Sequence, residues 1–170
     1  KAGGGQCYKF FEPLMHNEIV LQKQIENELH QAIQDGEFCL YFQPRYDYHN
    51  SKVEGVEALI RWNHPERGLL APGQFLPIAQ RSGLLPNIEQ WVLYEACHKA
   101  LKWRSMGLDF GRVAINVCAT ELQQLNFFGR IKSALDASGL PPELLEIEIT
   151  ERALIGQYSA VVDNLQKLHH

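Results

Sequence analysis

The sequence lacks the features that would place it at once in several common functional classes. It has no apolar run of about 18 residues and no charged-then-apolar leader, so neither a membrane-spanning helix nor a signal peptide is expected. The four cysteines are widely spaced and form no CxxC pair, which favours buried thiols of a cytoplasmic protein over a zinc site or disulfide framework. Whether a longer parent protein has an upstream membrane tether stays open.

Basic residues are not in excess either. The 16 Lys and Arg against 20 Asp and Glu give a net charge of −4, which argues against binding to nucleic-acid polymers or anionic membranes. A small phosphate ligand stays compatible with this balance, because it needs only a few well-placed cations. At 170 residues and 45% hydrophobic the chain has the size of one α/β domain.

The first half of the sequence predicts a helix followed by a hairpin. Apolar residues recur every four positions over 17–35, which indicates a helix that ends at Gly36. Phe38–Asp47 and Val53–Trp62 read as strands. The connection between them is too short for a crossover helix, so the two strands should pair antiparallel.

The second half predicts parallel βαβ units, because strands and helices alternate with long crossovers. Asn87 is expected as the N-cap of a long helix, and a Thr120-x-x-Gln123 capping box is expected to open another. We count four strands, three of them parallel. The expected elements are a short helix near Phe75–Arg81, a helix over Asn87–Met106, a strand over Arg112–Cys118, a strand over Leu144–Thr150 and a final helix near Gln157–His169.

Three expected strands each carry an oxygen ligand where an apolar side chain would be usual. These are Glu57, Asn116 and Glu148. In a parallel barrel, neighbouring strands deliver such residues to one site at their C-terminal ends. Two carboxylates and an amide carbonyl suit a hard cation such as Mg²⁺ or Mn²⁺. Each residue alone has an ordinary alternative: a paired carboxylate, a core amide, or, for Glu146 and Glu148, the solvent face of an alternating strand.

Two further polar residues on the expected hairpin are candidates for binding a ligand. Arg61 lies four positions after Glu57, about 13 Å along the same strand face, where its planar donor group suits a phosphate oxygen. An ordinary salt bridge is the alternative. Gln43 is a candidate for a base edge or ribose, with a surface glutamine as the alternative. The three tryptophans are expected in the core.

In motif content and order the sequence closely resembles the EAL-domain phosphodiesterases of bacteria, which hydrolyse cyclic di-GMP (c-di-GMP). The resemblance runs from about residue 25 to the end of the chain. It is carried by Tyr41-Phe42-Gln43-Pro44, Glu57-Ala58-Leu59-Ile60-Arg61-Trp62-Asn63-His64-Pro65, Phe75-Leu76-Pro77-Ile78-Ala79, Trp91-Val92-Leu93, Ala114-Ile115-Asn116-Val117 and Glu146-Ile147-Glu148-Ile149-Thr150-Glu151.

The resemblance implies a TIM-like (β/α)8 barrel with an antiparallel first strand, of which this chain holds the first half. It implies that Glu57, Asn116 and Glu148 are metal ligands of a two-metal Mg²⁺ or Mn²⁺ site, and that Glu57 and Glu151 serve catalysis, Glu151 by holding a loop near the metals. Arg61 is expected to contact a phosphate, and Gln43 and Leu59 to contact the nucleotide.

Three positions depart from the family pattern. Gln80 replaces a glutamate, Cys118 replaces a serine, and Arg45 lies where an apolar residue is common. None of these departures removes one of the expected metal ligands.

Residues 1–16 resemble the tail of a GGDEF diguanylate-cyclase domain, which implies that 17–36 is a connector helix and 37–170 the EAL domain without its C-terminal half. The chain begins at Lys1, as expected of a piece of a larger protein. The remaining ligands, including an aspartate and a lysine of the family, would follow His170. We therefore expect a literal 170-residue chain to be inactive and to pair with another copy.

Three functions follow from this interpretation. The first is metal-dependent hydrolysis of c-di-GMP to linear pGpG by the parent protein. The second is a non-catalytic c-di-GMP receptor that keeps the barrel without turnover. The third is a signalling module that docks a protein partner.

Overall fold

The computed structural model describes residues 13–49, 51–149, 164 and 166. In the described part, helices and strands alternate after an initial hairpin. The elements are α1 (Pro13–Asp35), β1 (Phe38–Asp47), β2 (Lys52–His64), β3 (Gly68–Leu70), α2 (Pro72–Arg81), α3 (Leu85–Ser105), β4 (Arg112–Val117), α4 (Ala119–Leu122), α5 (Phe127–Ser138), a 3-10 turn (Pro142–Leu144) and β5 (Leu145–Ile149).

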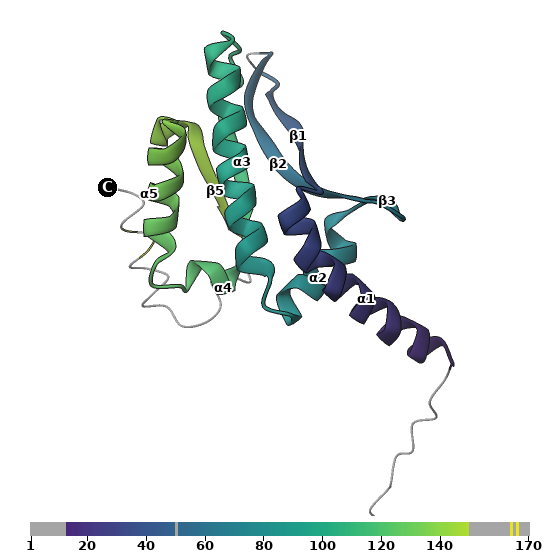
Figure 1. Ribbon diagram of the computed structural model, residues 1–170. Coiled ribbons are helices and arrows are strands. Elements are labelled where there is room, and N and C mark those ends of the chain that lie inside the picture. Colours follow the sequence, from purple (N-terminus) through teal and green to yellow (C-terminus); the bar gives the residue numbers. More distant parts are fainter. Residues whose placement is uncertain (1–12, 50, 150–163, 165, 167–170) are drawn as a thin grey trace, which may run out of the picture.

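The strands form one mixed sheet in the order β1-β2-β4-β5, with the short β3 added beside the end of β2. β1 pairs antiparallel with β2, as its short connection predicts, whereas β4 is parallel to both β2 and β5. Helices α3 and α5 lie on one face of this sheet (Figure 1). The arrangement is a partial TIM-like barrel with an antiparallel first strand, as expected.

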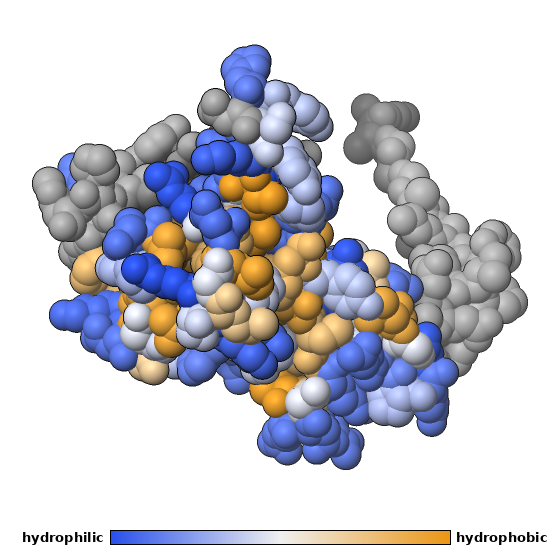
Figure 2. Space-filling view, turned by 90° about the horizontal axis from the view of Figure 1, so that it is seen from above, coloured by the Kyte–Doolittle hydropathy of each residue, from blue (hydrophilic) through white to orange (hydrophobic). Residues whose placement is uncertain are grey.

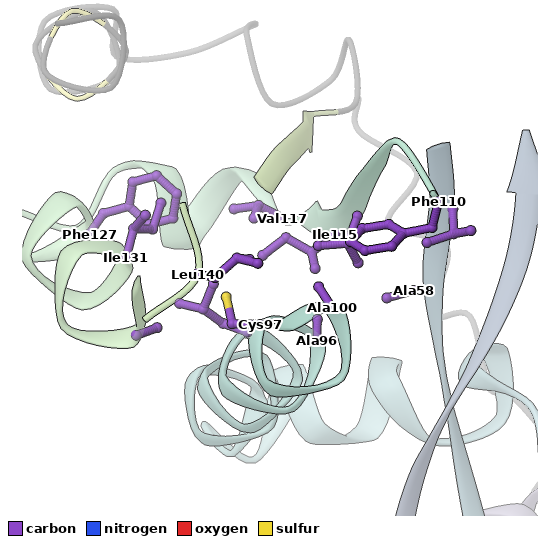
Figure 3. Close-up of a cluster of buried hydrophobic side chains, with 14 of the residues drawn as sticks. Ala58, Ala96, Cys97, Ala100, Phe110, Ile115, Val117, Phe127, Ile131 and Leu140 are labelled. Atoms are coloured by element: carbon purple, nitrogen blue, oxygen red, sulfur yellow. The ribbon is translucent and has the colours of Figure 1, made fainter. Parts of the chain in front are cut away.

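The hydrophobic core lies between the sheet and these helices. Small residues of α3, namely Ala96, Cys97 and Ala100, are completely buried and let the helix approach β4 closely. Figure 3 shows Ile115 and Val117 of β4 beside this surface of α3. Phe127 and Ile131 of α5 lie at the left of the view and belong to the same cluster. Because side chains alternate along a strand, this core takes every second residue and leaves the others on the opposite face.

A second core cluster joins α1 and α2 to the end of the hairpin. Trp62 and Phe75 are fully buried, with ring centroids 5.6 Å apart, and Leu29 of α1 is buried with them. The indole Nε1 of Trp62 donates a hydrogen bond to Glu37. Trp91 and Trp103 also pack against the two clusters, so the expectation that the tryptophans belong to the core is confirmed.

Apolar residues also reach the surface. Tyr41, Leu69 and Leu125 are each about half or more exposed. In the view from above, apolar patches lie among charged residues (Figure 2). None of the helices in the described part of the chain is long and apolar enough to cross a membrane.

Several predicted boundaries were wrong, mostly because proline is accepted in the first turn of a helix. Helix α1 begins at Pro13, and α3 begins at Leu85 with Pro86 in its first turn, so Asn87 is not the N-cap. The short strand β3 was not predicted.

The expected capping box does not form. Thr120 lies inside the four-residue α4 and its hydroxyl contacts the Cys118 thiol, while α5 begins only at Phe127. The predicted final helix lies outside the described residues except for helical positions 164 and 166.

Candidate functional site

The face of the sheet opposite α3 and α5 is polar, and it carries most of the residues singled out in the sequence. Strand pairing places Gln43 of β1 opposite Glu57 of β2, and Asn116 of β4 opposite Glu148 of β5. Glu57 itself pairs with Ala114, two residues before Asn116. Four strands thus bring Gln43, Glu57, Asn116 and Glu148 onto one face.

Glu57 and Asn116 are in direct contact. The amide nitrogen of Asn116 donates a 2.6 Å hydrogen bond to Glu57 Oε1. This contact holds the two side chains together across β2 and β4. Within the described part of the chain, no hydrogen bond reaches the amide carbonyl oxygen of Asn116, so this oxygen can take another partner.

The pKa of Glu148 is raised, and the nearby carboxylate of Glu57 is one of the causes. Burial raises its pKa, and the negative charge of Glu57 raises it further, whereas Arg45 opposes the rise. Two carboxylates that repel each other on one face are stabilised by a bound cation. The donor set of two carboxylates and an amide oxygen fits a hard cation such as Mg²⁺ or Mn²⁺.

The three candidate residues would supply only part of a metal site. Within the described ranges, no three His, Cys, Asp or Glu side chains gather closely enough to hold a metal ion by themselves. Glu151, the other expected catalytic residue, lies outside the described residues. A complete site therefore needs donors besides the three described ones.

Arg61 lies further along the polar face, towards the end of β2. Its guanidinium lies over the ring of Tyr41, with Cζ 5.6 Å from the ring centroid, and Nη1 donates to the carbonyl of Ile60. Among the residues that the structure describes, no carboxylate forms an ion pair with Arg61. The salt-bridge alternative is thus not what the structure shows, and the guanidinium retains donors for an anion.

A recess of about 470 Å³ lies beside the ends of β2 and β4. Leu59 lines it, together with Leu76 and Pro77 of α2, and Gln80 lies at its wall. Its lining is mainly apolar, with Asn116 and Glu89 as polar members. A flat aromatic ring such as a nucleobase suits such a recess. Gln43 is exposed on the neighbouring strand β1.

The partners of Arg45 were not predicted from the sequence. Its guanidinium donates two hydrogen bonds to Glu146, of 2.7 and 2.9 Å, and one of 2.7 Å to Glu148. Arg45 lowers the pKa of Glu146 chiefly through these hydrogen bonds. The signal was present in the alternation, because Arg45 follows Gln43 by two positions and Glu146 precedes Glu148 by two.

Glu89 of α3 was also missed. Its Oε1 accepts a hydrogen bond from the backbone N–H of Cys118, at the end of the strand that carries Asn116. Burial is the main cause of the raised pKa of Glu89. No sequence signal marks this residue, because a glutamate in an amphipathic helix normally faces solvent.

A model of the EAL domain matches residues 26–170 of the sequence. The chain belongs to the EAL domain family. This match covers most of the chain and includes every candidate site residue described above.

Named relatives agree with this assignment. The chain is 35% identical over 168 residues to the bifunctional diguanylate cyclase/cyclic di-GMP phosphodiesterase MucR of Pseudomonas aeruginosa, covering 99% of this chain and 24% of MucR. It is 33% identical over 168 residues to the cyclic di-GMP phosphodiesterase NbdA of the same organism, covering 99% of this chain and 22% of NbdA. The chain thus spans about a quarter or less of the length of these curated relatives.

The fold agrees with solved EAL structures. A c-di-GMP complex of the PaMucR phosphodiesterase superposes with a TM-score of 0.82 at 35% identity, covering 86% of this chain and 59% of that one. This similarity supports the interpretation of the sheet as part of a TIM-like barrel.

Proposed function

We propose that the natural full-length protein hydrolyses c-di-GMP to linear pGpG with the help of Mg²⁺ or Mn²⁺. The observation that carries this proposal is the placement of Glu57, Asn116 and Glu148 on one face of three neighbouring strands, with the first two 2.6 Å apart. Similarity to relatives named as c-di-GMP phosphodiesterases supports the choice of substrate.

In this proposal the three oxygen ligands hold the cations. Bound divalent cations would polarise the phosphodiester and lower the pKa of the attacking water. Glu57 and Glu148 supply negative charge, and the hydrogen bond from Asn116 fixes the orientation of Glu57. Glu151 would hold a nearby loop.

The substrate would extend from the cations along the polar face. Arg61, which retains free donors over Tyr41, would neutralise charge on a phosphate. Leu59 would contact the nucleotide from the wall of the apolar recess, and Gln43 would contact it from β1.

One observation favours a second candidate function. Glu148 already has a cationic partner, the guanidinium of Arg45 at 2.7 Å. A receptor that binds c-di-GMP without metal and without turnover could use this pair to neutralise the polar face. Nucleotide binding that persists in EDTA, with no pGpG after long incubation with Mn²⁺, would support the receptor. A module that only docks a protein partner would not bind c-di-GMP at micromolar concentration.

The test uses the full-length protein with Mn²⁺, and follows c-di-GMP and pGpG by liquid chromatography and mass spectrometry. We expect pGpG from the wild type, none in EDTA, and a loss of at least 100-fold in Glu57→Gln, since a charged metal ligand is removed. Glu95→Gln on α3, which pairs with Lys99 of the same helix, is the matched control and should stay active. Full activity of Glu57→Gln would contradict the proposal.

We further propose the domain arrangement in which residues 1–16 end an upstream GGDEF domain and 17–36 connect it to the EAL domain. The alignment with the bifunctional MucR includes nearly the whole chain, which is consistent with this arrangement. Because the described residues supply only part of a metal site, we expect the 170 residues alone to show no hydrolysis. A parent reading frame without an upstream GGDEF motif would contradict the domain arrangement.

A further inference from the structure

Arg45 connects two carboxylates of β5. Its Nη1 lies 2.7 Å from one oxygen of Glu146 and 2.7 Å from Oε1 of Glu148, and its Nη2 lies 2.9 Å from the other oxygen of Glu146. The three side chains are each about one-third exposed. One guanidinium from the first strand of the sheet thus links both glutamates of the last described strand.

The backbone of β2 makes room for this guanidinium. Gly55 is the strand partner of Arg45, and a Cβ at Gly55 would lie only 2.7 Å from Arg45 Nη2. The register between β1 and β2 shifts directly after Arg45, as in a β-bulge, which re-aims side chains locally. The position of Arg45 is therefore built into the hairpin by a glycine and a bulge.

We propose that Arg45 is a positioning residue that orients Glu148 for cation binding, an inference that rests on the proposed function. The two-pronged contact with Glu146 forms a pair without net charge. The third hydrogen bond then fixes Oε1 of Glu148 while adding little positive charge to the site. Among the residues that the structure describes, no hydrogen bond involves the second oxygen of Glu148, so a cation can approach it.

The alternative is that Arg45 only competes with the cation for Glu148. The two ideas give opposite signs for metal affinity when the guanidinium is removed at constant net charge. Hydrogen bonds that orient a metal ligand typically contribute 10- to 100-fold in metal affinity. A competing cation would instead lower the affinity, so its removal would raise it.

Two charge-conserving variants of the full-length protein separate these ideas. Arg45→Lys keeps the charge but replaces the planar fork with a single ammonium group. The double variant Arg45→Met with Glu146→Gln removes the whole pair and leaves the net charge unchanged. Mn²⁺ affinity is measured by isothermal titration calorimetry, and the rate of hydrolysis is measured against Mn²⁺ concentration. Arg104→Lys, on the exposed end of α3, is the control.

We expect both variants to bind Mn²⁺ at least about tenfold more weakly, with the thermal midpoint of the metal-free protein unchanged and much of the maximal rate recovered at saturating Mn²⁺. Affinity within twofold of the wild type in both variants, or tighter binding, would overturn the positioning role. If the double variant does not fold, Arg45→Lys decides. Failure of the wild type itself to bind Mn²⁺ would instead overturn the proposed function.

Discussion

Two arginines on the polar face of the sheet have different partners, and the difference follows from their positions along the strands. Arg45 faces Glu146 and Glu148, whereas Arg61 lies over Tyr41 and forms no ion pair in the part of the chain that the structure describes. A guanidinium that donates hydrogen bonds to two carboxylates orients them. One that retains free donors is suited to a phosphate.

A single methyl group at Gly55 tests the position of Arg45. Gly55→Ala would place a Cβ 2.7 Å from Arg45 Nη2 and 3.0 Å from the carbonyl oxygen of Arg112, so the guanidinium must move away from Glu146 and Glu148. We expect Mn²⁺ affinity in the full-length protein to fall about tenfold, as for Arg45→Lys. Isothermal titration calorimetry measures this directly.

The control for this variant is Gly129→Ala on α5, where an added Cβ meets nothing within 4 Å. It should leave Mn²⁺ affinity unchanged and slightly stabilise the helix, by about 0.5–1 kcal/mol. Unchanged Mn²⁺ affinity in Gly55→Ala would show that moving the Arg45 guanidinium does not affect cation binding. It would contradict the positioning role of Arg45.

At this scale the sequence singled out the candidate ligands more readily than the residues that contact them. Glu57, Asn116 and Glu148 stood out because each interrupts an apolar strand. Arg45 and Glu146 lie 101 positions apart in the chain and meet through the strand register. Glu89 depends on where the end of β4 meets α3. Register and packing are tertiary properties that a single sequence does not display.

At the scale of elements, α1 is attached to the barrel by charge as well as by apolar contacts. Glu28 of α1 accepts hydrogen bonds from His64 and Arg67, which flank the turn between β2 and β3. Burial alone would raise the pKa of Glu28, but the hydrogen bonds from Arg67 and His64 lower it on balance. The helix is thus fixed to the strand that carries Glu57 and Arg61.

The lowered pKa of Glu28 predicts a pH-dependent contribution to stability. A carboxyl whose pKa is lower in the folded state stabilises the fold above its ordinary pKa of 4.5, and this contribution disappears as the pH falls through the folded value. We expect Glu28→Gln to cost about 0.5–1 kcal/mol at pH 7, because the side chain is one-third exposed. The cost should shrink as the pH falls below 4.5.

Urea denaturation followed by tryptophan fluorescence measures this effect, since the ring of Trp62 lies 4.9 Å from that of His64. Glu26→Gln, on the same helix and paired with Lys23, serves as the control and should change stability little at neutral or acidic pH. A cost for Glu28→Gln that does not shrink as the pH falls would show that its hydrogen bonds act through something other than the ionised carboxylate.

Element types were predictable because each has a local signal. The short connection between Phe38–Asp47 and the next strand required a hairpin, and the structure pairs them antiparallel. Helix starts were harder, since Pro13 and Pro86 lie inside helices rather than before them. The three-residue strand β3 is too short to show a period of its own.

At the scale of the whole molecule, the strand order ends at β1 and β5, and each of these has one strand neighbour among the described residues. Unpaired edges and partly exposed apolar side chains favour association between chains. A protein of these 170 residues alone is therefore expected to self-associate, with a mass by light scattering at least twice 19.4 kDa. A monodisperse monomer would contradict this expectation. Light scattering of the natural full-length protein, measured in parallel, shows whether association occurs only when these 170 residues are produced alone.

The central claim is that Glu57, Asn116 and Glu148 form one cation-binding edge of a c-di-GMP hydrolysis site. Crystals of the full-length protein with Mn²⁺ and a non-hydrolysable c-di-GMP analogue test it most directly, by anomalous diffraction at the manganese edge. The account predicts an anomalous peak within about 2.0–2.4 Å of oxygens from all three side chains. Manganese bound elsewhere, or an analogue seated on this face with no metal beside these residues, would contradict it.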